Sequence, residues 1–144
     1  MTRSPLLAIL LAGTFSAGIV AGYTVRPASA SASAARVFEL RTYTSPPGKL
    51  PALHQRFREH TMEIFARHGM TNVVYWTPQD SARRENTLVY LLAYPSRQAA
   101  RDSWAAFSAD PEWQRVRAES EANGKIVEKV ESMFLDPTDF SPMK

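Results

Sequence analysis

The most regular pattern in the chain is the alternation of apolar and polar residues from Val37 to Thr44, a segment rich in β-branched and aromatic types. This alternation predicts a strand, which the Pro-Pro-Gly run at residues 46–48 ends. Over residues 50–68 the apolar positions recur three and four residues apart, which predicts one amphipathic helix. Gly69 follows as the residue that ends this helix.

Two further strands are predicted at residues 70–77 and 87–94, on either side of the polar residues 78–86. We expect the two strands to pair as a β-hairpin. The second of them is apolar on both faces, with Leu88, Tyr90 and Leu92 on one and Val89, Leu91 and Ala93 on the other. A strand of this kind is covered from both sides of its sheet.

The second helical region contains two predicted helix N-termini. Ser96 is suited to cap a helix whose inward side carries Ala100, Trp104 and Phe107. Asp110 and Pro111 then begin a new helical segment, which Asn123-Gly124 ends before a last strand at residues 125–135. Aromatic residues at helical spacing are typical of a core, so we expect Trp104, Phe107 and Trp113 to pack inward.

The predicted order is βαββαβ, the arrangement of the ferredoxin-like fold. The fold class is therefore α+β, with a four-stranded antiparallel sheet and the helices on one face. Those helices leave the other apolar face of the third strand uncovered, and a second copy of the same sheet is the simplest cover. We therefore predict a homodimer closed sheet to sheet.

Residues 1–34 have the features of an export segment. Arg3 precedes an apolar run from Leu6 to Val20, and alternating Ala and Ser residues at 28–34 offer several cleavage sites. This pattern is typical of a signal peptide. The alternative is an uncleaved membrane anchor, since residues 5–25 are long enough to span a bilayer. Either outcome predicts a periplasmic or secreted protein, with membrane attachment only through this segment.

Composition narrows the function classes. Two of the 17 basic residues, Arg3 and Arg26, lie in the export segment, so the rest of the chain has 15 against 14 acidic residues. Without a concentrated basic patch, nucleic-acid binding is not expected. The chain has no cysteine, which excludes disulfides, thiolate metal sites and a cysteine nucleophile. The sequence also lacks a Gly-rich phosphate loop, a G-x-S-x-G motif and an H-E-x-x-H motif.

Several short motifs occur together in a specific order: FELRTY at 38–43, PGKL at 47–50, HGM at 68–70, YW at 75–76 and DPEW at 110–113. In this combination the chain resembles the NIPSNAP family, over a domain that we place at residues 35–137, followed by a polar tail at 138–144. The resemblance implies a dimeric α/β barrel. It supplies no established reaction or catalytic residue set, although some related barrels are oxygenases, haem-degrading enzymes or isomerases.

Glu39, Arg41 and Tyr43 share one face of the first strand, opposite Phe38 and Leu40. We expect Phe38 and Leu40 to pack on the helices, so that the polar face points into the barrel between subunits. Together with Trp76 and Tyr90, these side chains form our predicted ligand site, which would hold a small molecule by charge-assisted hydrogen bonds and aromatic walls. The alternative is a structural network at the dimer seam.

Two histidines of the first helix, His60 and His68, are the weak candidates for catalysis. Either could act as a general base or as a haem or metal ligand, but a structural role for His68 at the helix end is the alternative. No metal site is predicted, because His60 and Glu63 are the only local pair of ligand types and Glu63 has Arg67 as an i,i+4 partner. We interpret His54 as a surface residue.

Our leading hypothesis is an exported homodimer that binds a small, partly apolar molecule without a cofactor. One alternative is a cofactor-independent or haem-linked oxygenase or isomerase, and another is a non-catalytic protein-interaction module. The sequence leaves open whether the protein is an enzyme.

Overall fold

The computed structural model describes residues 36–144, except for the side chain of Ser81. The predicted signal peptide or anchor at residues 1–34 lies outside this range. No helix within the described range is long and apolar enough to cross a membrane. The strands are β1 (Val37–Thr44), β2 (Thr71–Trp76), β3 (Thr87–Tyr94) and β4 (Lys129–Leu135). The helical elements are α1 (Leu50–Arg56), η1 (Phe57–Thr61), α2 (Met62–Arg67), α3 (Ser81–Arg84), α4 (Arg97–Ala109) and α5 (Pro111–Ser120).

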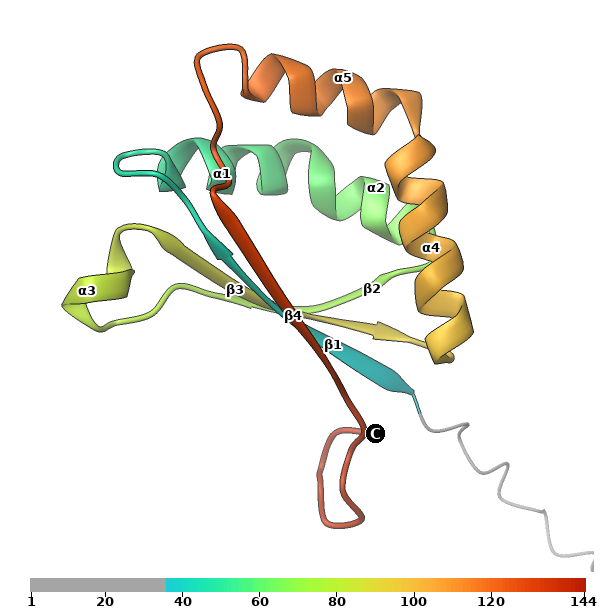
Figure 1. Cartoon of the computed structure of the whole chain (residues 1–144). Helices are drawn as coiled ribbons and strands as arrows, with labels where there is room; N and C mark the ends of the chain where they lie inside the picture. The colour runs from blue at the N-terminus through green and yellow to red at the C-terminus, as the bar shows by residue number, and fades with distance from the viewer. Residues whose placement is uncertain (1–35) are drawn as a thin grey trace, which may run out of the picture. The chain divides into compact units, whose positions relative to one another are not determined.

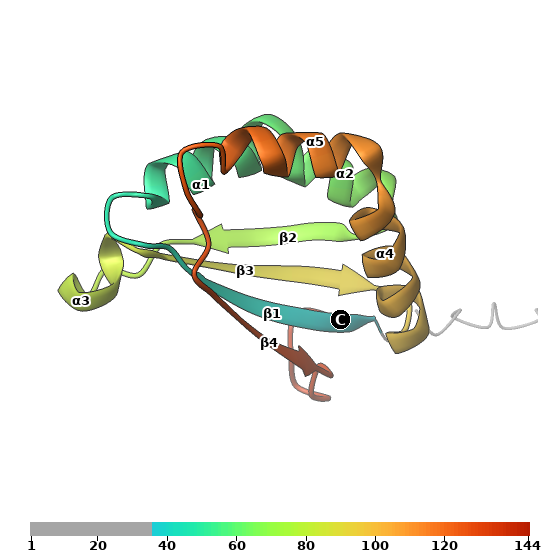
Figure 2. The ribbon, with the colours of Figure 1, turned by 45° about the horizontal axis from the view of Figure 1, so that its top comes forward.

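The four strands form one antiparallel sheet in the order β2-β3-β1-β4. This is the ferredoxin-like order, so the predicted fold class is confirmed. Figures 1 and 2 show α1, α2 and α5 on one side of the sheet, with α4 across the end at which β3 finishes. The opposite face carries no helix from the described residues. One face of the sheet is thus buried by helices and the other is left open.

The predicted helix over residues 50–68 is interrupted in its middle by the π-helical turn η1. Such a turn adds one residue and leaves backbone groups without their usual partners. Two side chains bond to carbonyl oxygens at the ends of this turn: the Thr61 hydroxyl donates to the Arg56 carbonyl oxygen at 3.2 Å, and Asn72 Nδ2 donates to the Met62 carbonyl oxygen at 2.9 Å. The second bond also ties the helix to β2.

The other differences from the predicted elements are small. The polar connection at residues 78–86 contains the short helix α3, and β4 begins at Lys129 rather than at residue 125. The tail returns to the start of β1, where the Arg36 guanidinium donates to the Lys144 carbonyl oxygen at 2.7 and 3.0 Å.

The orientation predicted for β1 was wrong. In the register of the sheet, Glu39 pairs with Leu92 and Arg41 pairs with Tyr90, and residues paired in this way share a face. Leu92 and Tyr90 are fully buried in the helix-covered core. Glu39 and Arg41 therefore lie under the helices, and Phe38 and Leu40 lie on the open face.

Aromatic side chains dominate the core on the helix-covered face. Phe65 of α2 contacts Tyr90, Trp104 and Phe107, with ring centroids 4.8–6.1 Å apart. Leu53, Ile64, Met70 and Leu92 fill the remaining space and are at most 1% exposed. Trp104, Phe107 and Trp113 all pack against or within this core, as the helical spacing predicted.

We predict that Thr61→Val lowers the free energy of unfolding by about 0.5–1.5 kcal/mol, because the buried hydrogen bond from the Thr61 hydroxyl to the Arg56 carbonyl oxygen is lost while the side-chain volume is nearly unchanged. Urea denaturation measures the change. Thr61→Ser, which keeps the hydroxyl, is the matched control. A Val variant as stable as wild type would contradict the role assigned to this bond.

Candidate functional site

Glu39 is the centre of a buried polar network. Its side chain is 1% exposed, and its two carboxylate oxygens accept four hydrogen bonds. Oε1 accepts from Arg41 Nη1 and Ser132 Oγ, both at 2.6 Å. Oε2 accepts from Tyr94 Oη and Trp104 Nε1, both at 2.7 Å. The donors come from β1, β3, β4 and α4, so one carboxylate joins three strands to a helix.

The electrostatics of this network keep Glu39 ionised. Burial by itself raises the pKa of a carboxyl group, but the hydrogen bonds from Ser132, Tyr94 and Trp104 and the charge of Arg41 outweigh it and lower the pKa of Glu39. The Arg41 guanidinium also lies over the Trp104 ring, 4.1 Å from its centroid. All four acceptor positions of Glu39 are occupied by protein donors, which is the arrangement of a structural network.

Tyr43 and Tyr90 lie next to this network but do not enclose a cavity. Tyr90 stacks on Tyr75 with ring centroids 5.4 Å apart and meets the edge of Tyr43 at 5.3 Å. Its hydroxyl is buried and has no hydrogen-bond partner among the described residues. The structure therefore brings Glu39, Arg41, Tyr43 and Tyr90 together, as predicted, but beneath the helices instead of between subunits.

Trp76 is not part of this group. It pairs with Val89 at the end of β2 and is 51% exposed, which puts it on the open side of the sheet. The prediction that it lies beside Glu39, Arg41 and Tyr43 was therefore wrong. The error follows from the orientation of β1, because the alternation alone does not say which face the helices cover.

A cleft of about 370 Å³ lies between η1 and the β2 edge of the sheet, and we call it the η1 cleft. A second hollow adjoins it and shares His54 and Arg58 with it. The walls of the η1 cleft are mostly apolar, and its imidazole and guanidinium groups come from one helix face. Its lining residues are His54, Phe57, Arg58, Met62, Tyr75, Trp76, Thr77 and Leu88.

His54 is the most informative residue of the η1 cleft. Its Nε2 atom is buried and has no hydrogen-bond partner among the described residues. Burial and the charge of Arg58 lower the pKa of His54, so the imidazole is neutral at neutral pH. A neutral imidazole with an unused nitrogen can accept a proton or a hydrogen bond from a ligand. Our interpretation of His54 as a surface residue was wrong; its i,i+3 and i,i+4 spacing to Phe57 and Arg58 was the available signal.

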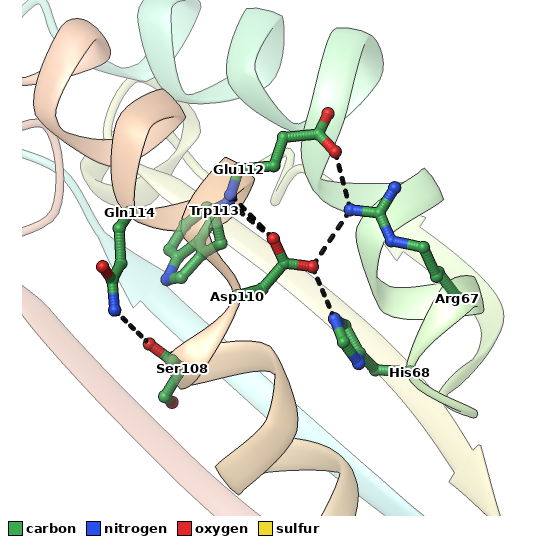
Figure 3. Close-up of polar contacts among 7 residues, drawn as sticks. All are labelled: Arg67, His68, Ser108, Asp110, Glu112, Trp113 and Gln114. Carbon is green, nitrogen blue, oxygen red and sulfur yellow. Dashed lines mark hydrogen bonds and ion pairs between the residues drawn. The ribbon is translucent and has the colours of Figure 1, made fainter.

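The structure gives His68 a set of polar contacts at the junction of two helices. Figure 3 shows His68 Nε2 at 2.6 Å from Asp110 Oδ2, which also accepts from Arg67 Nη2 at 3.0 Å. Arg67 donates to Glu112 at 2.7 Å as well, and not to Glu63 as the sequence suggested. The other Asp110 oxygen accepts from the backbone N–H groups of Glu112 and Trp113 and so caps α5. This cluster fastens the end of α2 to the start of α5.

His60 lies apart from both groups. It is half-buried and lines a hollow between η1 and α5 with Gln55, Glu59 and Ser120. Within residues 36–144, no three side chains of the metal-binding types are grouped so that they could hold an ion. The two histidines that the sequence singled out therefore line neither the η1 cleft nor a common site with each other.

Comparison with known proteins identifies the family. The NIPSNAP family model matches residues 38–142, most of the chain. The chain belongs to the NIPSNAP family. The predicted resemblance is thus confirmed. One of its motifs, DPEW at residues 110–113, begins with Asp110, which caps α5 and is the partner of His68.

Solved structures of NIPSNAP proteins share the fold. A NIPSNAP family protein of unknown function from Agrobacterium tumefaciens is 24% identical with a TM-score of 0.66, over 77% of this chain and 96% of that one. A NIPSNAP-like domain protein from Burkholderia xenovorans is 21% identical with a TM-score of 0.65, over 76% and 90%. SnoaB, a cofactor-independent oxygenase from Streptomyces nogalater, is 16% identical with a TM-score of 0.52, over 76% and 99%. No curated protein sequence matches.

The charge on Asp110 stabilises the NIPSNAP domain in a pH-dependent way. The hydrogen bond from His68, the contact with Arg67 and the two backbone N–H groups lower the pKa of Asp110 well below its ordinary value. As the pH falls, the unfolded chain therefore takes up this proton first. The stabilisation by this charge is fully present well above pH 4. It is lost progressively as the pH falls from about 4 toward the lower pKa that Asp110 has in the folded protein.

We predict that Asp110→Asn, which keeps a capping side chain, lowers the Tm by about 3–5 °C at pH 7 and by less at pH 2. Thermal unfolding followed by circular dichroism at both pH values measures the difference. Asp80→Asn is the control, because Asp80 precedes α3 without making a capping hydrogen bond. An equal effect of Asp110→Asn at both pH values would rule out the charge as the cause.

Proposed function

We propose that this NIPSNAP protein is exported and acts as a homodimer that binds a small, partly apolar molecule in the η1 cleft. The observation that carries the proposal is the unpartnered Nε2 of His54 in a cleft with aromatic and aliphatic walls. Buried polar atoms are nearly always paired in folded proteins. An unpaired nitrogen beside an open cleft is therefore a natural contact for a ligand.

The lining of the η1 cleft indicates the chemistry of this ligand. Phe57, Met62 and Leu88 offer apolar contact area, while His54 and Arg58 come from adjacent turns on one side. A molecule that fits has an apolar body, such as a ring, and a hydroxyl or carboxyl group that reaches the imidazole or the guanidinium. The hydroxyl of Tyr75 donates to Asn72, which is the residue that ties η1 to β2.

The π-helical turn supports a functional use of this cleft. Turns of this kind are rare and occur frequently at functional sites. In this protein η1 contributes Phe57 and Arg58 to the cleft, and the side chains of Thr61 and Asn72 bond to backbone carbonyl oxygens at the two ends of the turn. A π-helical turn is less stable than a uniform α-helix. A role in shaping a binding cleft would explain why this chain keeps it.

The open face of the sheet supports the homodimer. Trp76, Met133 and Leu135 are 51%, 56% and 39% exposed, and Leu40 and Leu91 lie on the same face. Soluble monomers rarely leave such a patch in water. A second copy related by a twofold axis would bury both patches at once. Export rests on the sequence of residues 1–34, which has the positive start, apolar run and small-residue sites of a signal peptide.

A cofactor-independent oxygenase is the second candidate, and His54 is the residue that favours it. A neutral imidazole in a largely apolar cleft is suited to remove a proton from an acidic O–H or C–H group of a bound substrate. SnoaB, which shares the fold, is a cofactor-independent oxygenase. In this function the substrate anion would remain held by Arg58 while oxygen reacts with it.

For the ligand site, we predict that the protein purified from its own host carries a small molecule detectable by native mass spectrometry. His54→Ala and Arg58→Gln should each weaken binding of that molecule by about tenfold or more, because each removes a polar contact in a poorly hydrated cleft. His60→Ala is the matched control and should bind as wild type does. Binding that survives both cleft substitutions would refute the assignment of the site.

For the dimer, we predict that the exported protein sediments as a dimer at micromolar concentration. Met133→Glu should shift it to the monomer, because a charge placed within an apolar interface is left unpaired. Gln114→Glu on the exposed surface of α5 is the control and should leave the dimer intact. A wild-type protein that sediments as a monomer across this concentration range would contradict the proposed dimer.

A further inference from the structure

A second cleft lies at the opposite edge of the sheet from the η1 cleft. It has a volume of about 310 Å³ and opens between α5 and the start of β4, and we call it the α5 cleft. Tyr43, Arg56 and Trp113 form part of its wall, and none of them takes part in the function proposed above. The two clefts have no lining residue in common, although Tyr43 of the α5 cleft pairs with Leu88 of the η1 cleft in the sheet.

Arg56 has an unusual position in the α5 cleft. Its side chain is 4% exposed, yet its guanidinium makes only two hydrogen bonds, both from Nη1 and both at 3.2 Å, to Ser120 Oγ and Glu121 Oε1. Its Nε is buried without an acceptor, and Nη2 donates no hydrogen bond within the described residues. The edge of the guanidinium formed by Nε and Nη2 is therefore unused.

That edge is the one that matches a planar acceptor. Two parallel N–H groups of a guanidinium pair with the two oxygens of a carboxylate at once. Arg41 also has a buried Nε without an acceptor, but its Nη1 donates to Glu39 at 2.6 Å and it does not line the α5 cleft, whereas Arg56 does. A buried arginine with an unused edge at the wall of a cleft is a contact for a carboxylate from outside the chain.

The charges around the α5 cleft favour a ligand that carries a single negative charge. Arg117 and Lys125 add to Arg56, and Glu121 and Glu128 oppose them, so the lining carries one net positive charge. Glu121 is already engaged, since Arg117 lies 3.5 Å from its other oxygen. Burial lowers the pKa of Arg56 more than Glu121 raises it, so the protein itself does not fully compensate this cation. The two nearby glutamates disfavour a dianion such as phosphate.

The remaining walls are apolar and aromatic. The Trp113 ring lies beside the guanidinium, with its centroid 5.1 Å from Arg56 Cζ, and Tyr43 meets Phe57 edge to face behind it. Val130, on the rim, is 43% exposed. A ring attached to the carboxylate would stack in this space. We propose that the α5 cleft binds an aromatic carboxylate through the Nε and Nη2 atoms of Arg56.

The test follows the Arg56 Nε–H signal of the full-length exported protein, labelled with ¹⁵N-arginine, in ¹H–¹⁵N NMR spectra. Benzoate is the probe, benzamide is its neutral isostere and inorganic phosphate is the competing anion. We expect benzoate to shift the Arg56 signal and to bind about tenfold more tightly than benzamide or phosphate. Arg56→Lys keeps the charge without the planar edge and should weaken benzoate binding about tenfold.

Two control variants show whether benzoate binds at Arg56 in particular. Arg115→Lys, on the exposed side of α5, and Arg101→Lys, on the exposed side of α4, should both leave the benzoate-induced shift of the Arg56 signal unchanged. Benzoate bound at Arg58 in the η1 cleft is distinguished by the same readout, because the two clefts have no lining residue in common. Failure of the η1 proposal alone would therefore not alter this result. If Arg56→Lys does not fold, Lys125→Gln on the cleft rim replaces it and should weaken benzoate about threefold. An Arg56 signal that ignores benzoate, or equal binding of benzamide or phosphate, would overturn the proposal.

Discussion

The buried carboxylate of Glu39 is the constraint on which the rest of this fold depends. A carboxylate away from water is stable only when donors surround it, and Glu39 obtains four of them from β1, β3, β4 and α4. Meeting this requirement fixes the position of α4 on the sheet through Trp104 and places Ser132 of β4 opposite Arg41. It also determines that the polar side of β1 faces the helices. The aromatic core around Tyr90 and Phe65 then fills the space that remains.

The consequence for function is a division of the sheet into three regions. The interior around Glu39 is filled and both oxygens of this carboxylate are fully bonded, so it serves the fold. The open face, with Met133 and Leu135, offers apolar area for another copy of the chain. The two edges carry the clefts, each with a basic or imidazole side chain from the α1–η1 segment that lacks a full set of protein partners. His54 faces one edge and Arg56 the other, because they lie two residues apart on this helix. A single helical segment therefore supplies the key polar group to both candidate binding sites.

The sequence predicted the order of elements correctly, because the switch between alternating and helical periodicity is strong in each segment. It could not predict which side of β1 the helices cover. Phe38 and Leu40 form the apolar side of that strand, so burial of apolar area alone favours placing them under the helices. Because β3 is apolar on both faces, it is compatible with either orientation of β1. The decision depends on hydrogen-bond donors from distant positions, Tyr94, Trp104 and Ser132. His54 was missed for a related reason: its spacing to Phe57 and Arg58 places the three residues on one helix face, but not beside a cleft. Recognition of the family, in contrast, depended on short local motifs and was secure.

The ionisation of Glu39 is the most direct test. It is monitored through the ¹³C NMR signal of the side-chain carboxyl group during an acid titration of the folded protein. We predict that this signal stays that of a carboxylate well below the ordinary glutamate pKa of about 4.3, and changes only when the protein unfolds. Titration of Glu39 at or above that value, in a protein that remains folded, would contradict the central role given to the buried carboxylate.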